Sequence, residues 1–104
     1  MDTRALQVRL RNFAIERNWQ QFHTPKNLVS ALVVEAAELA EIFQWMTPAQ
    51  SEQAHCDSSM KECIADELAD VMLYLLQIAD YTNVDLNLAV ERKIEKNAIK
   101  HALN

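Results

Sequence analysis

Apolar residues recur every three to four positions through most of this chain, which is the spacing of one helix face. The pattern is interrupted at three points, so it predicts four long helices. We expect the first three at about Thr3–Arg17, Pro25–Met46 and Ser59–Tyr81. The fourth is expected to be capped by Asp85 and to end near Ala102. The fold class is therefore expected to be all-α, with residues 1–104 forming one domain built as a four-helix bundle.

Residues that favour helix starts support these boundaries. Thr24 is followed directly by a proline, which combines a capping hydroxyl with proline in the first turn. Ser59 with Glu62 three residues later resembles a capping box, and Asp85 suits the start of the last helix. Residues 47–58 are polar, so they are expected to form a connection with at most a short turn of helix.

The helix expected to end at Tyr81 is apolar on most of its circumference. A helix of this kind is normally buried on several sides, and four helices of one small subunit can hardly cover it. We therefore expect a homodimer or homotetramer in which helices of a second subunit complete the core. Two apolar stripes run along this helix: Ile64, Leu68, Val71, Leu75 and Ile78, and Ala65, Ala69, Met72, Leu76 and Ala79.

Two pairs of carboxylates interrupt the apolar helices. Glu35 and Glu38 lie three residues apart, as do Glu67 and Asp70, and three residues advance a helix by roughly 300°, so each pair shares one face. Antiparallel packing of the two helices would gather all four carboxylates, and like charges that close must protonate or bind cations. Oxygen ligands suit a hard divalent cation, here Mg²⁺ with Mn²⁺ as a substitute. The alternative is that both pairs lie on solvated faces.

Other acidic residues have more ordinary interpretations. Glu41 continues the series of the second helix, where it is either a ligand of a second ion, a group that orients a water, or a surface glutamate. Glu62, Asp66 and Asp80 are expected to face solvent.

Composition narrows the classes of function. The chain contains no glycine, so a Gly-rich phosphate loop is excluded and any phosphate must be bound by side chains and metal. The net charge of −5 argues against nucleic acid as a partner. No apolar run approaches a membrane span, the first residues lack a signal-peptide core, and there are two cysteines, so we expect a cytoplasmic protein without a membrane partner.

The acidic pattern resembles the metal motif of the MazG-like nucleotide pyrophosphohydrolases, which belong to the all-α NTP pyrophosphatase superfamily. Glu-x-x-Glu is followed by Glu-x-x-Asp after a spacer of 28 residues. Within that group the chain looks most like the small dCTP-pyrophosphatase type. The resemblance covers nearly the whole chain, and its most specific segments are residues 19–28, 31–45 and 67–76.

The resemblance implies an enzyme that hydrolyses nucleoside triphosphates to the monophosphate and pyrophosphate. Glu35, Glu38, Glu67 and Asp70 would hold Mg²⁺ on the triphosphate while water attacks the α-phosphorus. Glu38 or Glu41 would take the proton from that water. The implied substrates are dCTP-like or modified deoxynucleotides, and the implied role is housekeeping of the nucleotide pool.

The last helix carries Lys93, Asn97 and Lys100 on one face. This arrangement resembles the family's phosphate-binding element, except that His101 stands where tyrosine is usual, which puts a role for that last residue in doubt. The alternative is a solvated basic helix end that complements the helix dipole.

The base would need aromatic surfaces, and in the resembling subfamily tryptophans such as Trp19 and Trp45 line its pocket; the alternative for both is core packing. The second helix is about 30 Å long, so if both contact one base, one of them comes from a neighbouring subunit. His23 and Asn27 are candidates for polar contacts to base or sugar, with a structural hydrogen bond as the alternative for His23. Tyr74 is placed to stack on the sugar and disfavour a 2′-hydroxyl.

One competing hypothesis is a non-catalytic helical interaction module, such as an antitoxin-like partner, whose acidic pairs bind a basic protein. A di-iron carboxylate bundle fits poorly, because no histidine follows Glu35 or Glu67 at the Glu-x-x-His spacing.

Overall fold

The computed structural model describes residues 1–103, and all regular secondary structure in that range is helical. This confirms the all-α class. No helix among these residues is both long and apolar enough to cross a lipid bilayer. The α-helices are α1 (Thr3–Glu16), α2 (Pro25–Phe43), α3 (Pro48–Glu52), α4 (Ser58–Tyr81) and α5 (Leu86–Lys100), and the 3₁₀ turns are η1 (Gln20–Phe22) and η2 (Ala54–Cys56).

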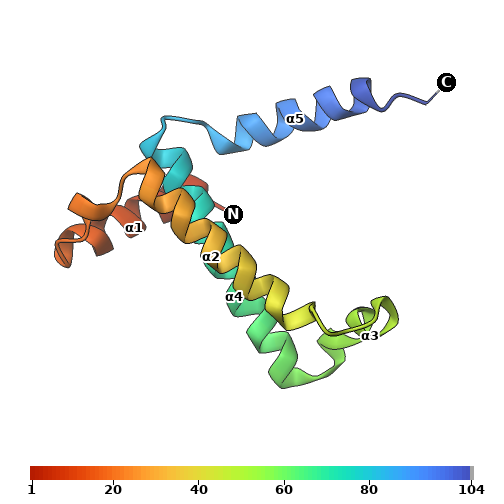
Figure 1. Ribbon diagram of the computed structural model, residues 1–104. Coiled ribbons are helices and arrows are strands. Elements are labelled where there is room, and N and C mark those ends of the chain that lie inside the picture. The colour runs from red at the N-terminus through yellow and green to blue at the C-terminus, as the bar shows by residue number, and fades with distance from the viewer. Residues whose placement is uncertain (104) are drawn as a thin grey trace.

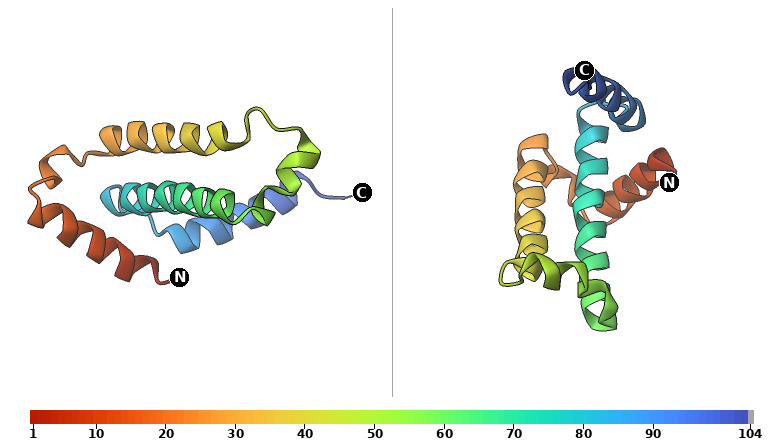
Figure 2. Two further views of the ribbon diagram at one scale, coloured as in Figure 1. Left: turned by 90° about the horizontal axis from the view of Figure 1, so that it is seen from below. Right: turned by 90° about the vertical axis from the view of Figure 1, so that its right-hand side faces the viewer.

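Helices α2 and α4 form the centre of the structure and lie side by side in opposite directions (Figure 1). Helix α4 lies between α2 and α1 in the right-hand view of Figure 2, and it contacts a helix on each side. Helix α5 leaves the end of α4 and projects away from the α2–α4 pair (Figure 1). The antiparallel pairing matters for the site, because it sets the acidic faces of α2 and α4 against each other.

Side-chain caps fix most helix starts where the sequence predicts them. The Thr24 hydroxyl accepts a hydrogen bond from the Asn27 N–H at 3.2 Å, with proline in the first turn of α2. Asp85 caps α5. The predicted capping box at Ser59 is wrong, because the Asp57 carboxylate accepts from the Met60 N–H at 2.9 Å and α4 begins one residue earlier.

The polar connection is more regular than expected. Thr47 and Gln50 form a reciprocal capping box that starts α3, and η2 follows. This second start also explains why α2 ends at Phe43 rather than Met46: Thr47 adopts an extended backbone ahead of a proline, so the preceding residues form a turn. Helix α5 ends at Lys100, two residues before the predicted end.

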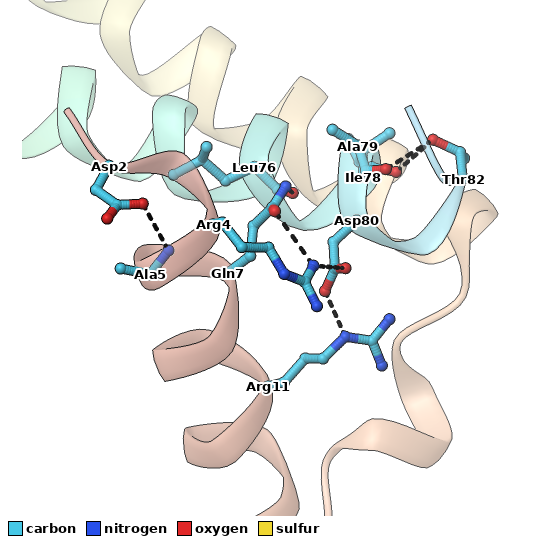
Figure 3. Close-up of polar contacts among 10 residues, drawn as sticks. All are labelled: Asp2, Arg4, Ala5, Gln7, Arg11, Leu76, Ile78, Ala79, Asp80 and Thr82. Carbon is cyan, nitrogen blue, oxygen red and sulfur yellow. Dashed lines mark hydrogen bonds and ion pairs between the residues drawn. The ribbon is translucent and has the colours of Figure 1, made fainter. Parts of the chain in front are cut away.

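A set of polar contacts fastens α1 to the C-terminal half of α4 (Figure 3). The buried Gln7 amide donates to the Leu76 carbonyl at 2.9 Å, and Arg4 donates to Asp80 at 2.9 Å. Arg11 pairs with the other oxygen of the same carboxylate. Asp80 was expected to face solvent, but its side chain is only 7% exposed. The prediction failed because α1, which neutralises this charge, comes from the other end of the sequence.

The chain leaves an unusually large surface open. Its radius of gyration is 16.7 Å, against about 13 Å for a compact domain of this length. Its accessible surface is 8031 Å², whereas a compact monomer of 11.9 kDa exposes about 6,000 Å². Val33 and Val34 of α2 and Leu68 of α4 are each more than half exposed. A closed four-helix bundle is therefore not formed within the single chain.

Candidate active site

Helices α2 and α4 bring three of the four predicted ligands together. Glu35 and Glu38 project from α2 and Glu67 projects from α4, and one carboxylate oxygen from each lies within 4.8 Å of the others. The residues between the paired carboxylates are small or apolar and exposed: Ala36 and Ala37 on α2, and Leu68 and Ala69 on α4. We call these three residues the carboxylate cluster.

Crowding and burial disfavour the charged form of the cluster. Burial raises the pKa of Glu35 from 4.5 to about 7, and the neighbouring carboxyls of Glu38 and Glu67 and the charge of Asp70 add to that rise. Burial also raises the pKa of Glu67, and the negative charges of Glu38 and Asp70 act in the same direction. The protein thus holds acidic groups in a place where they need a proton or a cation.

Two carboxylate oxygens in this cluster have no partner in the described chain. Glu35 Oε2 and Glu67 Oε2 are both buried and accept no hydrogen bond from residues 1–103. Burying such an acceptor without a partner is costly. A divalent cation with oxygen ligands would satisfy both atoms at once, so the residues present fit such an ion.

Asp70 and Glu41 lie at the margin of this cluster. Asp70 is outside the group of mutually close oxygens, although its charge influences both Glu35 and Glu67. Glu41 is exposed and lines an open hollow of about 470 Å³ together with Glu38 and Glu67. The hollow gives solvent and ligands access to the cluster. Its other lining residues, which sequence reasoning did not assign to the site, are Ile42, Cys63 and Asp66.

The candidate base-contacting residues fall into two separate places. Trp19 and His23 flank η1 ahead of α2, and Asn27 lies in the first turn of α2. Trp19 packs edge-on against Phe13 with ring centroids 5.5 Å apart. Asn27 uses its side-chain amide to donate to the Phe22 carbonyl at 3.0 Å, which is a structural bond.

The other tryptophan lies beyond the opposite end of α2. Trp45 is 89% exposed, so nothing in the described chain covers its ring. Tyr74 is half-buried on α4, one turn after Asp70. A single chain therefore does not gather the two tryptophans around one base, as the length of α2 led us to expect.

The basic stripe lies apart from the carboxylates. Lys93, Asn97 and Lys100 are all exposed on α5, which projects away from α2 and α4 (Figure 1). Phosphate bound at the cluster would not meet these side chains in the same chain. The sequence predicted the stripe itself but carried no signal for where α5 would lie.

The raised pKa of Glu35 predicts how stability depends on pH. The folded chain binds this proton more tightly than the unfolded chain does, so the group's contribution to stability falls as pH rises from about 4.5 to about 7. In the presence of EDTA, thermal unfolding should show this loss in the parent chain and a smaller one in Glu35→Gln. Mg²⁺ affinity should rise over the same interval because the ligand must deprotonate. Identical pH profiles for the two chains would contradict the assignment.

An antiparallel helix pair that shares a partly buried carboxylate cluster defines an all-helical protein with a candidate divalent-cation site. The chain belongs to the MazG-like family, whose pattern its residues 31–104 match. This confirms the resemblance drawn from the acidic motif.

Named relatives agree with that membership. The chain is 45% identical over 85 residues to human dCTP pyrophosphatase 1, covering 82% of this chain and 50% of that protein. It is 40% identical over 92 residues to dCTP pyrophosphatase 1 from Rattus norvegicus, covering 88% and 54% respectively. The chain thus spans about half the length of these relatives. The crystal structure of a pyrophosphatase from Archaeoglobus fulgidus DSM 4304 superimposes with a TM-score of 0.88 at 38% identity, covering 99% of this chain and 94% of that one.

Proposed function

We propose that this chain hydrolyses nucleoside triphosphates to the monophosphate and pyrophosphate, with Mg²⁺ as cofactor. The observation that carries the proposal is the carboxylate cluster with its two buried, unpartnered oxygens. Membership of the MazG-like family and the similarity to proteins named as pyrophosphatases support it.

Glu35, Glu38 and Glu67 would hold the cation, and Asp70, whose charge acts on Glu35 and Glu67, would join them as the fourth ligand. The ion supplies positive charge that offsets the phosphate oxygens. A water attacks the α-phosphorus, the bond from that phosphorus to the bridging oxygen breaks, and the pyrophosphate leaves with the bonding electrons. Glu41 takes the proton of the attacking water, because it lines the hollow without belonging to the cluster. Glu38 is the alternative base.

The substrates we propose are deoxynucleotides, dCTP-like or modified. Two of the relatives are named for dCTP. Stacking on tryptophan accepts every base, so selection among bases falls to polar groups such as His23 at the start of α2. Tyr74, one turn beyond Asp70 on α4, is placed to contact the sugar.

We further propose that the working unit is a homo-oligomer whose site combines two chains. The large open surface and the exposed apolar residues of α2 and α4 call for a second copy. That copy would close the bundle and bring α5, with Lys93, Asn97 and Lys100, to the phosphates. Charge supports this arrangement, because α5 is a basic segment in a chain of net charge −5.

The direct test is a screen of the four dNTPs, the four NTPs and several damaged deoxynucleotides for pyrophosphate release. We expect turnover with Mg²⁺ or Mn²⁺, none in EDTA, and a preference for deoxycytidine-type substrates. Pyrophosphate and monophosphate should appear in equal amounts. Full activity in EDTA would exclude the mechanism, and a chain that hydrolyses none of these compounds but captures a basic protein would favour an interaction module.

A further inference from the structure

Arg11 connects α1 to the end of α4 through two different contacts. Its Nε pairs with Asp80, as Figure 3 shows, and that carboxylate raises the pKa of the guanidinium further above its ordinary value. The guanidinium carbon also lies 4.4 Å from the centroid of the Tyr81 ring. A cation at this distance from an aromatic face is attracted to it, so Arg11 restrains the ring.

Tyr81 in turn contacts the loop that precedes α2. Its ring meets the His23 imidazole edge-on, with centroids 6.3 Å apart and planes at 88°. His23 ends η1, and its backbone N–H donates to the Gln20 carbonyl at 3.1 Å. The side chain is thus held from one side by Tyr81 while the backbone is held by η1.

His23 keeps one polar atom free. Its Nδ1 is buried and makes no hydrogen bond with any residue of the described chain. Most buried polar atoms have a partner, so this nitrogen is set to meet a group from outside the chain. Asp80, Arg11, Tyr81 and His23 therefore form a continuous series of contacts that ends in a buried ring nitrogen without a partner in the described chain.

We propose that Arg11 and Tyr81 are positioning residues for nucleotide binding. Arg11, anchored by Asp80, fixes the Tyr81 ring, and the ring orients His23 toward the base or sugar. This inference rests on the proposed function. Ten residues of α2 separate its start from Glu35, about 15 Å of helix, and we place the nucleoside end of a nucleotide whose phosphates lie at the cluster on the His23 side.

The chain supplies matched controls for this idea. Arg4 pairs with the same Asp80 carboxylate at 2.9 Å, whereas the cation–π contact with the Tyr81 ring comes from Arg11. Removing Arg4 therefore weakens the same ion-pair group without releasing the ring. Tyr81→Phe keeps the ring and Tyr81→Leu removes it, and no hydrogen bond of the Tyr81 hydroxyl contributes to the series.

The experiment measures kcat and KM for the best substrate of the screen, with thermal unfolding confirming that each variant is folded at the assay temperature. We expect Arg11→Gln and Tyr81→Leu to raise KM about three- to tenfold with kcat changed by less than about twofold. Arg4→Gln and Tyr81→Phe should keep the parent KM. In a His23→Ala background, adding Arg11→Gln should raise KM no further.

Several results would overturn the proposal. One is an unchanged KM in Arg11→Gln or Tyr81→Leu, and another is an equal rise in Arg4→Gln, which would mark the ion pairs as purely structural. A third is a rise in KM on adding Arg11→Gln to the His23→Ala chain that is as large as the rise in the parent chain. If Arg11→Gln does not fold, Tyr81→Leu decides alone. Because the parent chain is assayed beside the variants, a failure of the positioning series is distinct from a failure of the hydrolase assignment, in which the parent itself is inactive.

Discussion

The Glu38→Gln chain should release pyrophosphate at least about 100-fold more slowly than the parent chain. Glu38 belongs to the carboxylate cluster and also lines the hollow, so its charge is needed where cation and substrate meet. Calorimetric titration should show weaker Mg²⁺ binding in this variant, and Mg²⁺ should no longer raise its unfolding temperature.

Glu41→Gln separates proton transfer from metal binding. If Glu41 accepts the proton, this variant loses kcat while its Mg²⁺ affinity stays at the parent value. Glu62→Gln is the matched control, because Glu62 is an exposed glutamate of α4 that does not line the hollow. It should behave like the parent in both measurements. If Glu38→Gln kept the parent's activity, the carboxylate cluster would have no role in the hydrolysis. If Glu41→Gln lost Mg²⁺ binding, Glu41 would be a metal ligand and not the base.

The carboxylate cluster was predictable because it depends on local geometry and one pairing. The three-residue spacing fixes which face each pair occupies, and the apolar surroundings indicate that the face is turned inward. The one further assumption that the prediction needed was the antiparallel packing of α2 on α4. Asp70 shows the limit of this reasoning: helical spacing placed it on the correct face, whereas side-chain geometry decides whether its oxygen joins the other three.

Asp80 and α5 could not be placed from the sequence for a different reason. The burial of Asp80 depends on Arg4 and Arg11, which are more than sixty residues away along the chain. Gln7 and Arg11 lie one helical turn apart, and this polar stripe on α1 was the available signal. Helix α5 packs little against the other helices of the described chain, so no local pattern encodes its direction.

Mixing two impaired variants should restore activity. Glu38→Gln damages the cluster, and a chain carrying both Lys93→Ala and Lys100→Ala lacks the charges of α5, which should cost at least about tenfold in kcat/KM. If α5 acts on the cluster of a second chain, a mixed dimer contains one site with both parts intact. Random assembly from equal amounts makes half of the dimers mixed, so co-refolded chains should recover about a quarter of the parent activity.

The control is a mixture of Glu38→Gln with Glu35→Gln, in which both changes lie on α2. If each cluster is built from one chain, every cluster in this mixture carries a substitution, and an intact α5 from the neighbour cannot rescue it. Activity would return only if the cluster itself were assembled from two chains. Recovery in the control but not in the test mixture would therefore mean that two chains share the carboxylates of one cluster, and not that one chain supplies the cluster and the other supplies α5. Recovery in neither mixture, with mixed oligomers verified by mass, would mean that each chain's α5 serves its own cluster, and the projecting helix would have to fold back toward Glu35 and Glu67 when the nucleotide binds.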